Sequence, residues 1–234
     1  MWKRQLWAFH AAVGGAVITV VSLALVELAW ALGSGLFTVA AAAAARTWAR
    51  HDPTPMPYAM RWILFAPRPY QSPRRLKAIL ALRGGERLLE IGPGTGAHAL
   101  PIAASLGPDG ILDVLDIQKE MLDHLMRLAA RSGIANIVAT LGDARKLPYP
   151  DAAFDGAYLI SVLGEIPDSD AALRELRRVL KPSGGLVIGE VFVDPDFIPL
   201  AELLRRAGKA GFSFERRTGL PLAYLARFGQ VNNR

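Results

Sequence analysis

The chain of 234 residues contains no cysteine, and this absence excludes several kinds of chemistry. Without a thiol there is no disulfide, no thiolate ligand for a metal ion and no cysteine nucleophile. The four histidines stand at positions 10, 51, 98 and 124, too scattered for the spacing of a zinc site. We therefore predict that the chain binds no metal and that any catalysis uses oxygen and nitrogen side chains or an organic cofactor.

Charge is almost missing near the N-terminus. From Leu6 to Ala45 the only ionisable side chains are those of His10 and Glu27. A bilayer is crossed by about 20 apolar residues, so this run is long enough for two membrane spans, which we predict at residues 6–26 and 30–48. Basic residues flank both outer ends of the run: Lys3, Arg4, Arg46 and Arg50. A single long tilted span is the alternative.

The basic excess of the chain lies entirely beside this apolar run. Residues 1–75 contain eight basic and two acidic side chains, and the remainder contains 19 of each, so the net charge of +6 belongs to the first third. A nucleic-acid enzyme carries its basic surface near the catalytic site, so we expect no nucleic-acid partner. Basic residues stay on the cytoplasmic side of membrane spans. We therefore predict a protein of the cell membrane whose catalytic domain faces the cytoplasm.

We divide the chain into three parts. Residues 1–50 form the predicted transmembrane stem, residues 51–72 a juxtamembrane segment, and residues 73–234 the catalytic domain. The middle part is rich in proline, arginine and aromatic residues. Such a composition suits the headgroup layer of a bilayer. A linker helix that packs on the catalytic domain explains it equally well, and the sequence leaves both interpretations open.

Short apolar runs alternate with helical patterns after residue 73, which is typical of a parallel sheet with helices on both faces. We predict strands at residues 87–91, 110–116, 137–141, 154–160 and 186–192. We predict helices at residues 73–82, 97–106, 119–132, 169–180 and 199–210. Two further strands, at residues 212–218 and 222–228, are joined by a short turn and must be antiparallel. The predicted fold is a doubly wound α/β sheet of seven strands that ends in a hairpin.

A glycine-rich loop follows the first of these strands. Residues 88–96 read Leu-Leu-Glu-Ile-Gly-Pro-Gly-Thr-Gly, and a helical segment comes directly after them. Glycines allow a ligand to approach the backbone closely, and the helix start favours negative charge. Glu90 adds a preference for an ammonium or a hydroxyl. The loop by itself also fits a dinucleotide site, because Asp116 lies about 20 residues beyond it.

The loop resembles the first motif of the class I S-adenosylmethionine (SAM)-dependent methyltransferases, an acid followed by Gly-x-Gly-x-Gly. Residues 142–144 (Gly-Asp-Ala), 147–155 and 174–185 also resemble later motifs of this family, which decides against a dehydrogenase. The resemblance covers about residues 72–227 and implies a Rossmann-like fold that binds SAM and releases S-adenosylhomocysteine. Within the family, the domain is similar to bacterial phospholipid N-methyltransferases and to quinone C-methyltransferases.

The resemblance also implies roles for individual residues. Asp116 should accept hydrogen bonds from the ribose hydroxyls, Ile117 should pack on adenine, and Asp143 should accept from the adenine amino group. The full set that we expect to bind the cofactor is Glu90, Gly92, Gly94, Gly96, Asp116, Ile117, Asp143, Ala144 and Ser161.

The methyl acceptor should enter near the ends of the fourth and fifth strands. Glu165 lies there and could hold an ammonium or take its proton. Tyr58 and Tyr70, from the juxtamembrane segment, could bind methylated cations on their ring faces. A membrane-anchored methyltransferase suits a lipid acceptor, and we expect the amine of phosphatidylethanolamine, methylated toward phosphatidylcholine. The alternatives are the ring carbon of a membrane quinone, and a SAM-binding membrane protein without catalytic activity.

Overall fold

The computed structural model divides the chain into two compact units, Met1–Thr47 and Trp48–Arg234. It describes residues 27–28, 30–32, 34–38, 40–41, 43–48, 51–65 and 69–231. In the first unit the described residues are helical, and nearly all of their side chains are exposed. The predicted span at residues 6–26 lies outside the described residues. Within the described part of the chain, no helix combines the length and the apolarity needed to cross a membrane, so both spans stay predictions.

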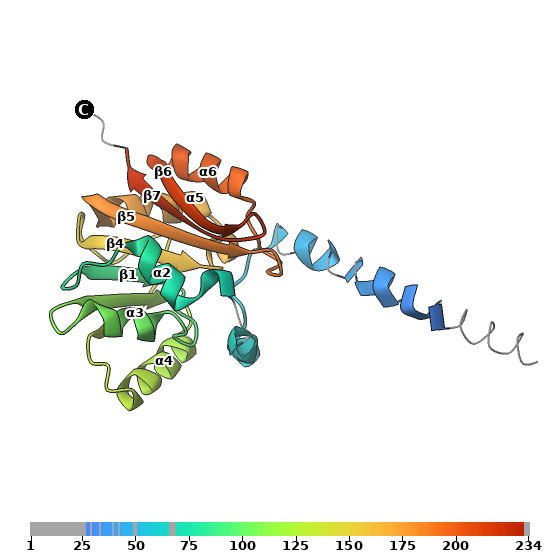
Figure 1. Ribbon diagram of the computed structural model, residues 1–234, viewed down its shortest axis with the longest axis horizontal. Helices are drawn as coiled ribbons and strands as arrows, with labels where there is room; N and C mark the ends of the chain where they lie inside the picture. The colour runs from blue at the N-terminus through green and yellow to red at the C-terminus, as the bar shows by residue number, and fades with distance from the viewer. Residues whose placement is uncertain are drawn as a thin grey trace, which may run out of the picture. The chain divides into compact units, whose positions relative to one another are not determined.

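The second unit is built on one seven-stranded sheet in the order β3-β2-β1-β4-β5-β7-β6 (Figure 1). Neighbours among the first five strands are parallel, and β7 is antiparallel to both β5 and β6. The strands are β1 (Arg87–Ile91), β2 (Ile111–Asp116), β3 (Ile137–Leu141), β4 (Phe154–Ile160), β5 (Leu180–Val191), β6 (Phe212–Leu220) and β7 (Ala223–Gln230). The helices are η1 (Tyr58–Phe65), η2 (Pro69–Gln71), α2 (Pro73–Leu80), α3 (Ala99–Leu106), α4 (Lys119–Arg131), η3 (Leu163–Glu165), α5 (Ser169–Val179) and α6 (Leu200–Lys209).

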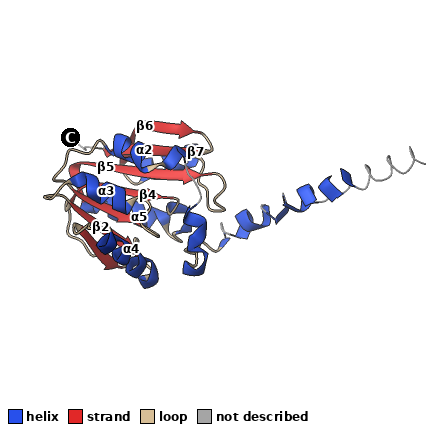
Figure 2. Ribbon diagram, turned by 60° about the horizontal axis from the view of Figure 1, so that its bottom comes forward, coloured by secondary structure: helices blue, strands red, loops and turns tan. Residues whose placement is uncertain are grey.

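Helices cover both faces of this sheet, as the alternation of strands and helices predicts (Figure 2). Successive side chains of a strand point to opposite faces. Leu88 of β1 therefore packs with α2, α3 and α4, while its neighbour Leu89 packs with α5 and α6. Both leucines are almost completely buried, so β1 lies at the centre of two separate cores. The predicted Rossmann-like fold and its closing hairpin are confirmed.

One predicted boundary is wrong by more than two residues. We expected a helix at residues 169–180 and a strand from Leu186, but α5 ends at Val179 and β5 already begins at Leu180. Leu180 pairs with Phe154 before the register shifts, and Gly156 then pairs with Gly185. Residues 181–185 contain a proline and two glycines, which favour a turn in the sequence. In the structure the pairing of Leu180 and Gly185 with β4 makes this stretch part of β5.

The last two strands are tied to the first helix of the unit. Arg216 of β6 and Arg227 of β7 each donate a hydrogen bond to the backbone carbonyl of Ile79, at 2.9 and 3.0 Å. Ile79 lies in the last turn of α2, where carbonyl groups lack partners within the helix. The two guanidinium groups therefore cap α2 and close the domain between its first and last elements.

Candidate active site

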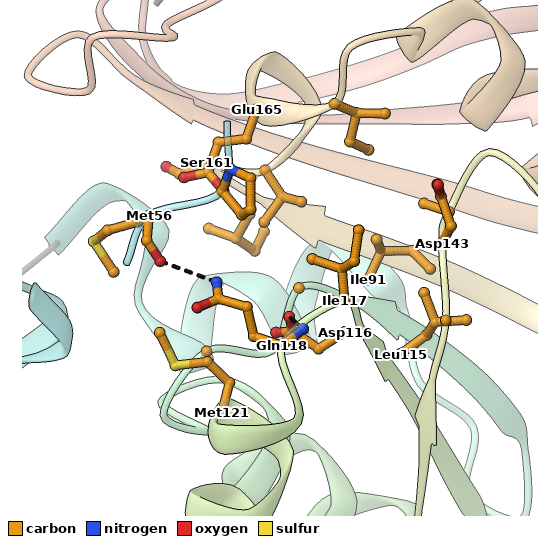
Figure 3. A pocket seen from close by; sticks show the side chains of 18 of the residues that line it. Met56, Ile91, Leu115, Asp116, Ile117, Gln118, Met121, Asp143, Ser161 and Glu165 are labelled. Carbon is orange, nitrogen blue, oxygen red and sulfur yellow. Dashed lines mark hydrogen bonds between the residues drawn. The ribbon is translucent and has the colours of Figure 1, made fainter. Parts of the chain in front are cut away.

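A cavity of about 220 Å³ opens where the parallel strands end at their carboxyl termini. Ligands of doubly wound sheets bind at this edge, where the strand order changes direction. Figure 3 shows side chains from several loops that converge on the cavity. The sequence-predicted residues that line it are Gly92, Gly94, Asp116, Ile117, Asp143, Ala144, Ser161 and Glu165.

The glycine loop takes a backbone conformation that other residues rarely adopt. Gly92, Gly94 and Gly96 have φ angles of +63°, +53° and +88°. A Cβ atom on Gly92 would lie 2.6 Å from the side chain of Val162, and one on Gly94 would lie 2.8 Å from Leu64. Two reasons therefore require glycine at each of these positions: the positive φ angle and the close neighbouring side chain. The loop leaves its backbone within reach of a ligand.

Asp116 ends β2 at the floor of the cavity and is 8% exposed. Burial raises the pKa of its carboxyl group, and hydrogen bonds from the backbone N–H groups of Gln118, Ile117 and Gly94 oppose this rise. The bond from the Gln118 N–H to Oδ1 measures 2.9 Å. A carboxylate fixed in this way can accept two hydrogen bonds from neighbouring hydroxyls, as the ribose of the cofactor would require.

Asp143 lies on the same cavity but already has a partner. Its Oδ2 is 2.6 Å from Nη2 of Arg145, and its Oδ1 accepts from the Arg145 backbone N–H. These bonds lower the pKa of the Asp143 carboxyl group. Ala144 is buried beside it, while Ile117 on the facing loop is 55% exposed and offers an apolar surface. The part assigned to Asp143 in binding adenine stays a prediction, with Arg145 as an added neighbour.

Ser161 follows β4 with a φ angle of +55°, unusual for a residue with a side chain. Its backbone N–H donates to the carbonyl of Gly189 at 2.8 Å, which holds the turn against β5. The hydroxyl is buried and has no hydrogen-bond partner in the described part of the chain. Strain and an unpaired polar group often gather at functional sites, and this hydroxyl is available to a ligand of the cavity.

Glu165 ends the short helix η3 on the opposite wall. Burial, together with the negative charges of Asp194 and Asp196, raises the pKa of its carboxyl group to about 8. The Met56 backbone N–H donates to it and opposes this shift. Apolar residues, among them Val162 and Ile166, line the same cavity, as does Asp194. At neutral pH the group is therefore largely protonated and can exchange a proton with a bound molecule.

Glu90 does not line this cavity but a second one, of about 530 Å³, on the other side of the glycine loop. Gly92 and Gly94 line both cavities. The Tyr158 hydroxyl donates to Glu90 Oε2 at 2.8 Å, and burial raises the pKa of Glu90 to about 8. A cationic group placed beside Glu90 would favour its ionised form.

The segment before η1 contributes Pro55 and Met56 to the lining of the first cavity, so this part of the predicted juxtamembrane segment packs on the domain. The carbonyl of Met56 accepts a hydrogen bond from Gln118 Nε2 at 3.0 Å (Figure 3). Leu64 of η1 lines both cavities. Met56, Leu64 and Gln118 were not among the residues that the sequence predicts to line the site. Only their positions in space reveal them, because no motif marks them.

Tyr58 and Tyr70 do not line either cavity. The Tyr58 hydroxyl lies 3.3 Å from Nδ1 of His124, and the Arg61 guanidinium lies 4.4 Å from the centre of its ring. Arg75 lies 5.5 Å from the centre of the Tyr70 ring. One face of each ring is thus already covered by an arginine. Their placement gives no support to the prediction that these tyrosines hold the acceptor.

These residues fit SAM. Asp116 suits the ribose and Ile117 the adenine, and the glycine loop leads from their cavity to the second one, where Glu90 suits the ammonium group. The unpaired Ser161 hydroxyl and the protonated Glu165 lie on the same cavity as Asp116.

Comparison with known proteins points the same way. The family model described as methyltransferase domain matches residues 88–184. The chain is 34% identical over 139 residues to 27-O-demethylrifamycin SV methyltransferase of Amycolatopsis mediterranei, covering 58% of this chain and 50% of that protein. It is 40% identical over 110 residues to the ubiquinone/menaquinone biosynthesis C-methyltransferase UbiE of Pseudomonas putida, covering 47% and 43%. The chain thus spans about half the length of the curated relatives that it matches.

Among solved structures, a SAM-dependent methyltransferase from Aquifex aeolicus superposes with a TM-score of 0.69. The superposition covers 76% of this chain and 100% of that one, at 19% sequence identity. At this identity the likeness concerns the fold. The superposition extends over more of the second unit than the stretch at residues 88–184 that the family model matches.

Replacing Asp116 by Ala should weaken SAM binding by about 1–3 kcal/mol, because ribose hydroxyls buried without an acceptor lose their hydrogen bonds. Isothermal titration calorimetry with SAM measures the change. Asp113→Ala is the matched control: Asp113 lies on the same strand but pairs with Arg87 at 2.8 Å and does not line either cavity. Equal affinity of the Asp116→Ala variant and the native chain would contradict the assignment.

Proposed function

We propose that this chain is a class I SAM-dependent methyltransferase, that it methylates a lipid dissolved in a membrane, and that the acceptor is the ring carbon of a quinol. The observation that carries the proposal is Glu165, a buried carboxyl group on the cofactor cavity, which apolar residues such as Ile63, Leu64 and Val162 also line. Apolar walls suit a ring with a hydrocarbon tail, and a carboxyl group with a raised pKa suits a phenolic proton.

The cofactor, SAM, supplies a methyl group bound to a positively charged sulfur, and the acceptor carbon displaces that sulfur. The work of the protein is to hold both reactants in line and to manage one proton. Methylation of a quinol ring replaces a C–H by a C–CH₃ bond and releases one proton. The Glu165 carboxylate can take the hydroxyl proton, which makes the ring more nucleophilic. The names of the UbiE relatives refer to ubiquinone and menaquinone, which agrees with this chemistry.

Exposed apolar side chains beside the cavity support a lipid acceptor. Val193 is 83% exposed, Phe192 45% and Leu222 55%. The Phe192 backbone N–H donates to the Leu222 carbonyl at 2.7 Å, which joins the loop after β5 to the turn between β6 and β7. We call these three residues the apolar rim. The next residue, Asp194, lines the cavity, so the rim is adjacent to the cavity along the chain. Together with the apolar run near the N-terminus, the rim suits attachment to a cell membrane with the catalytic domain on the cytoplasmic side.

The second candidate acceptor is the amine of phosphatidylethanolamine. It is favoured by the acidic side chains that accompany Glu165, namely Asp194 on the cavity wall and Asp196 nearby. Several carboxyl groups at one mouth attract an ammonium group, and a bound cation would lower their pKa values. The third possibility, binding of SAM without methyl transfer, makes no use of Glu165.

One assay separates the three candidates. The purified chain is incubated with SAM carrying a labelled methyl group and vesicles that contain either demethylmenaquinol or phosphatidylethanolamine, and the lipids are then separated. Label in the quinol supports the proposal. Label in the phospholipid supports the second candidate, and no label in either lipid, with SAM binding intact, supports the third.

The rate of methyl transfer should rise with pH through about 8, because only the ionised form of Glu165 accepts a proton and this form prevails above its pKa of about 8. Glu165→Gln should lose this rise and slow transfer by about 10²–10⁴-fold. Initial rates between pH 6 and 9 at saturating SAM test this. Glu202→Gln is the control, because Glu202 lies outside the cavity and forms ion pairs with Arg205 and Arg206. An unchanged pH profile in Glu165→Gln would show that another group takes the proton.

The double substitution of Val193 and Leu222 by Asp should slow turnover several-fold when the acceptor is in vesicles, because charged groups do not enter the apolar part of a bilayer. Turnover with the same acceptor in detergent micelles should change less. Val138→Asp is the control, since Val138 is 48% exposed on β3 at the other edge of the sheet. Equal losses in vesicles and micelles would mean that the rim acts on the site and not on the bilayer.

A further inference from the structure

The second cavity is lined by a polar side chain that no motif marks. Gln71, at the end of η2, is 1% exposed, and neither its Nε2 nor its Oε1 has a hydrogen-bond partner among the residues that the structure describes. Buried amides nearly always have partners, because an unpaired donor or acceptor costs free energy. A group that can accept from Nε2 is therefore expected to bind at this position.

The backbone around Gln71 is fixed. Its carbonyl accepts a hydrogen bond from Nε2 of His98 at 2.7 Å, and His98 directly precedes α3. Prolines at positions 69 and 73 restrict the chain on both sides. A Cβ atom on Gly189 of β5 would lie 3.4 Å from Gln71 Nε2, so a larger residue there would crowd the amide. The amide group is thus held beside the glycine loop before any ligand arrives.

The wall that Gln71 shares with Glu90 has the polarity of an α-amino acid site. Glu90 is 2% exposed and suits an ammonium group, while the Gln71 amide N–H suits a carboxylate. Gly92 and Gly94 line both cavities, so a ligand with its ribose at Asp116 reaches the second cavity by passing along the loop. The end of SAM that extends away from the ribose carries one ammonium and one carboxylate.

We propose that Gln71 binds the carboxylate at the amino-acid end of SAM through its Nε2–H group, and that it thereby distinguishes the complete cofactor from fragments that lack this end. Gln71 lies outside the matched stretch at residues 88–184, so the family comparison does not assign it. The proposal rests on the identity of the cofactor and is independent of the acceptor.

The test compares ligands that differ only at this end. Calorimetry on the full chain measures the affinity for S-adenosylhomocysteine, which has the amino-acid end, and for methylthioadenosine, which lacks it. Gln71→Leu should lose about tenfold or more in affinity for S-adenosylhomocysteine, as expected when a hydrogen bond to a charged group is removed. Its affinity for methylthioadenosine should stay within about twofold of the native value.

Asp116→Ala is the matched control. Both ligands carry the ribose, so both should bind this variant more weakly than they bind the native chain. Native affinity of Gln71→Leu for both ligands would overturn the proposal. Equal losses for both ligands would also overturn it, since Gln71 would then support the loop and not the ligand. If Gln71→Leu does not fold, the isosteric Gln71→Glu decides by the same comparison, because it removes the donor and places a negative charge beside the carboxylate.

Discussion

The close contact between the glycine loop and its neighbours is the constraint on which the site depends. Val162 and Leu64 lie so near Gly92 and Gly94 that no side chain fits at either position. Because these neighbours come from the turn after β4 and from η1, the loop fixes the relative positions of three separate segments. The cavity that suits SAM, the wall that holds Glu165 and the covering segment all depend on this one packing arrangement.

Burial of acids is the second property that shapes the site. Glu90 and Glu165 both have pKa values raised to about 8, and the pKa of buried Glu190 is also raised. An ionised carboxylate is more stable in water than in the protein interior. Burial of each of these groups therefore lowers the free energy of unfolding. An unfolded chain would ionise these groups near pH 4.5, and the native state binds more protons between that pH and about 8. Stability therefore declines as pH rises through this interval.

Much of this arrangement could be predicted from the sequence, because strands and glycine turns leave local patterns. The order of elements, the closing hairpin and the position of Asp116 at the end of β2 all follow from such patterns. Residues 51–72 are different: Met56 and Leu64 act through contacts with residues distant in the sequence, and nothing nearby marks them. The ring chemistry of Tyr58 and Tyr70 predicts a site for cations of the acceptor, yet the structure pairs their rings with Arg61 and Arg75. Long-range packing, which local patterns do not encode, decides such cases.

The capping of α2 by the last two strands has a consequence for synthesis on the ribosome. The bonds from Arg216 and Arg227 to Ile79 join residues 137 and 148 positions apart. At about 5–20 residues per second, the ribosome needs roughly 7–30 s to add the chain between these partners. During that interval α2 has emerged with uncapped carbonyl groups, and β5 has an open edge until β7 arrives. The nascent domain therefore completes its fold only after β6 and β7 have left the ribosome.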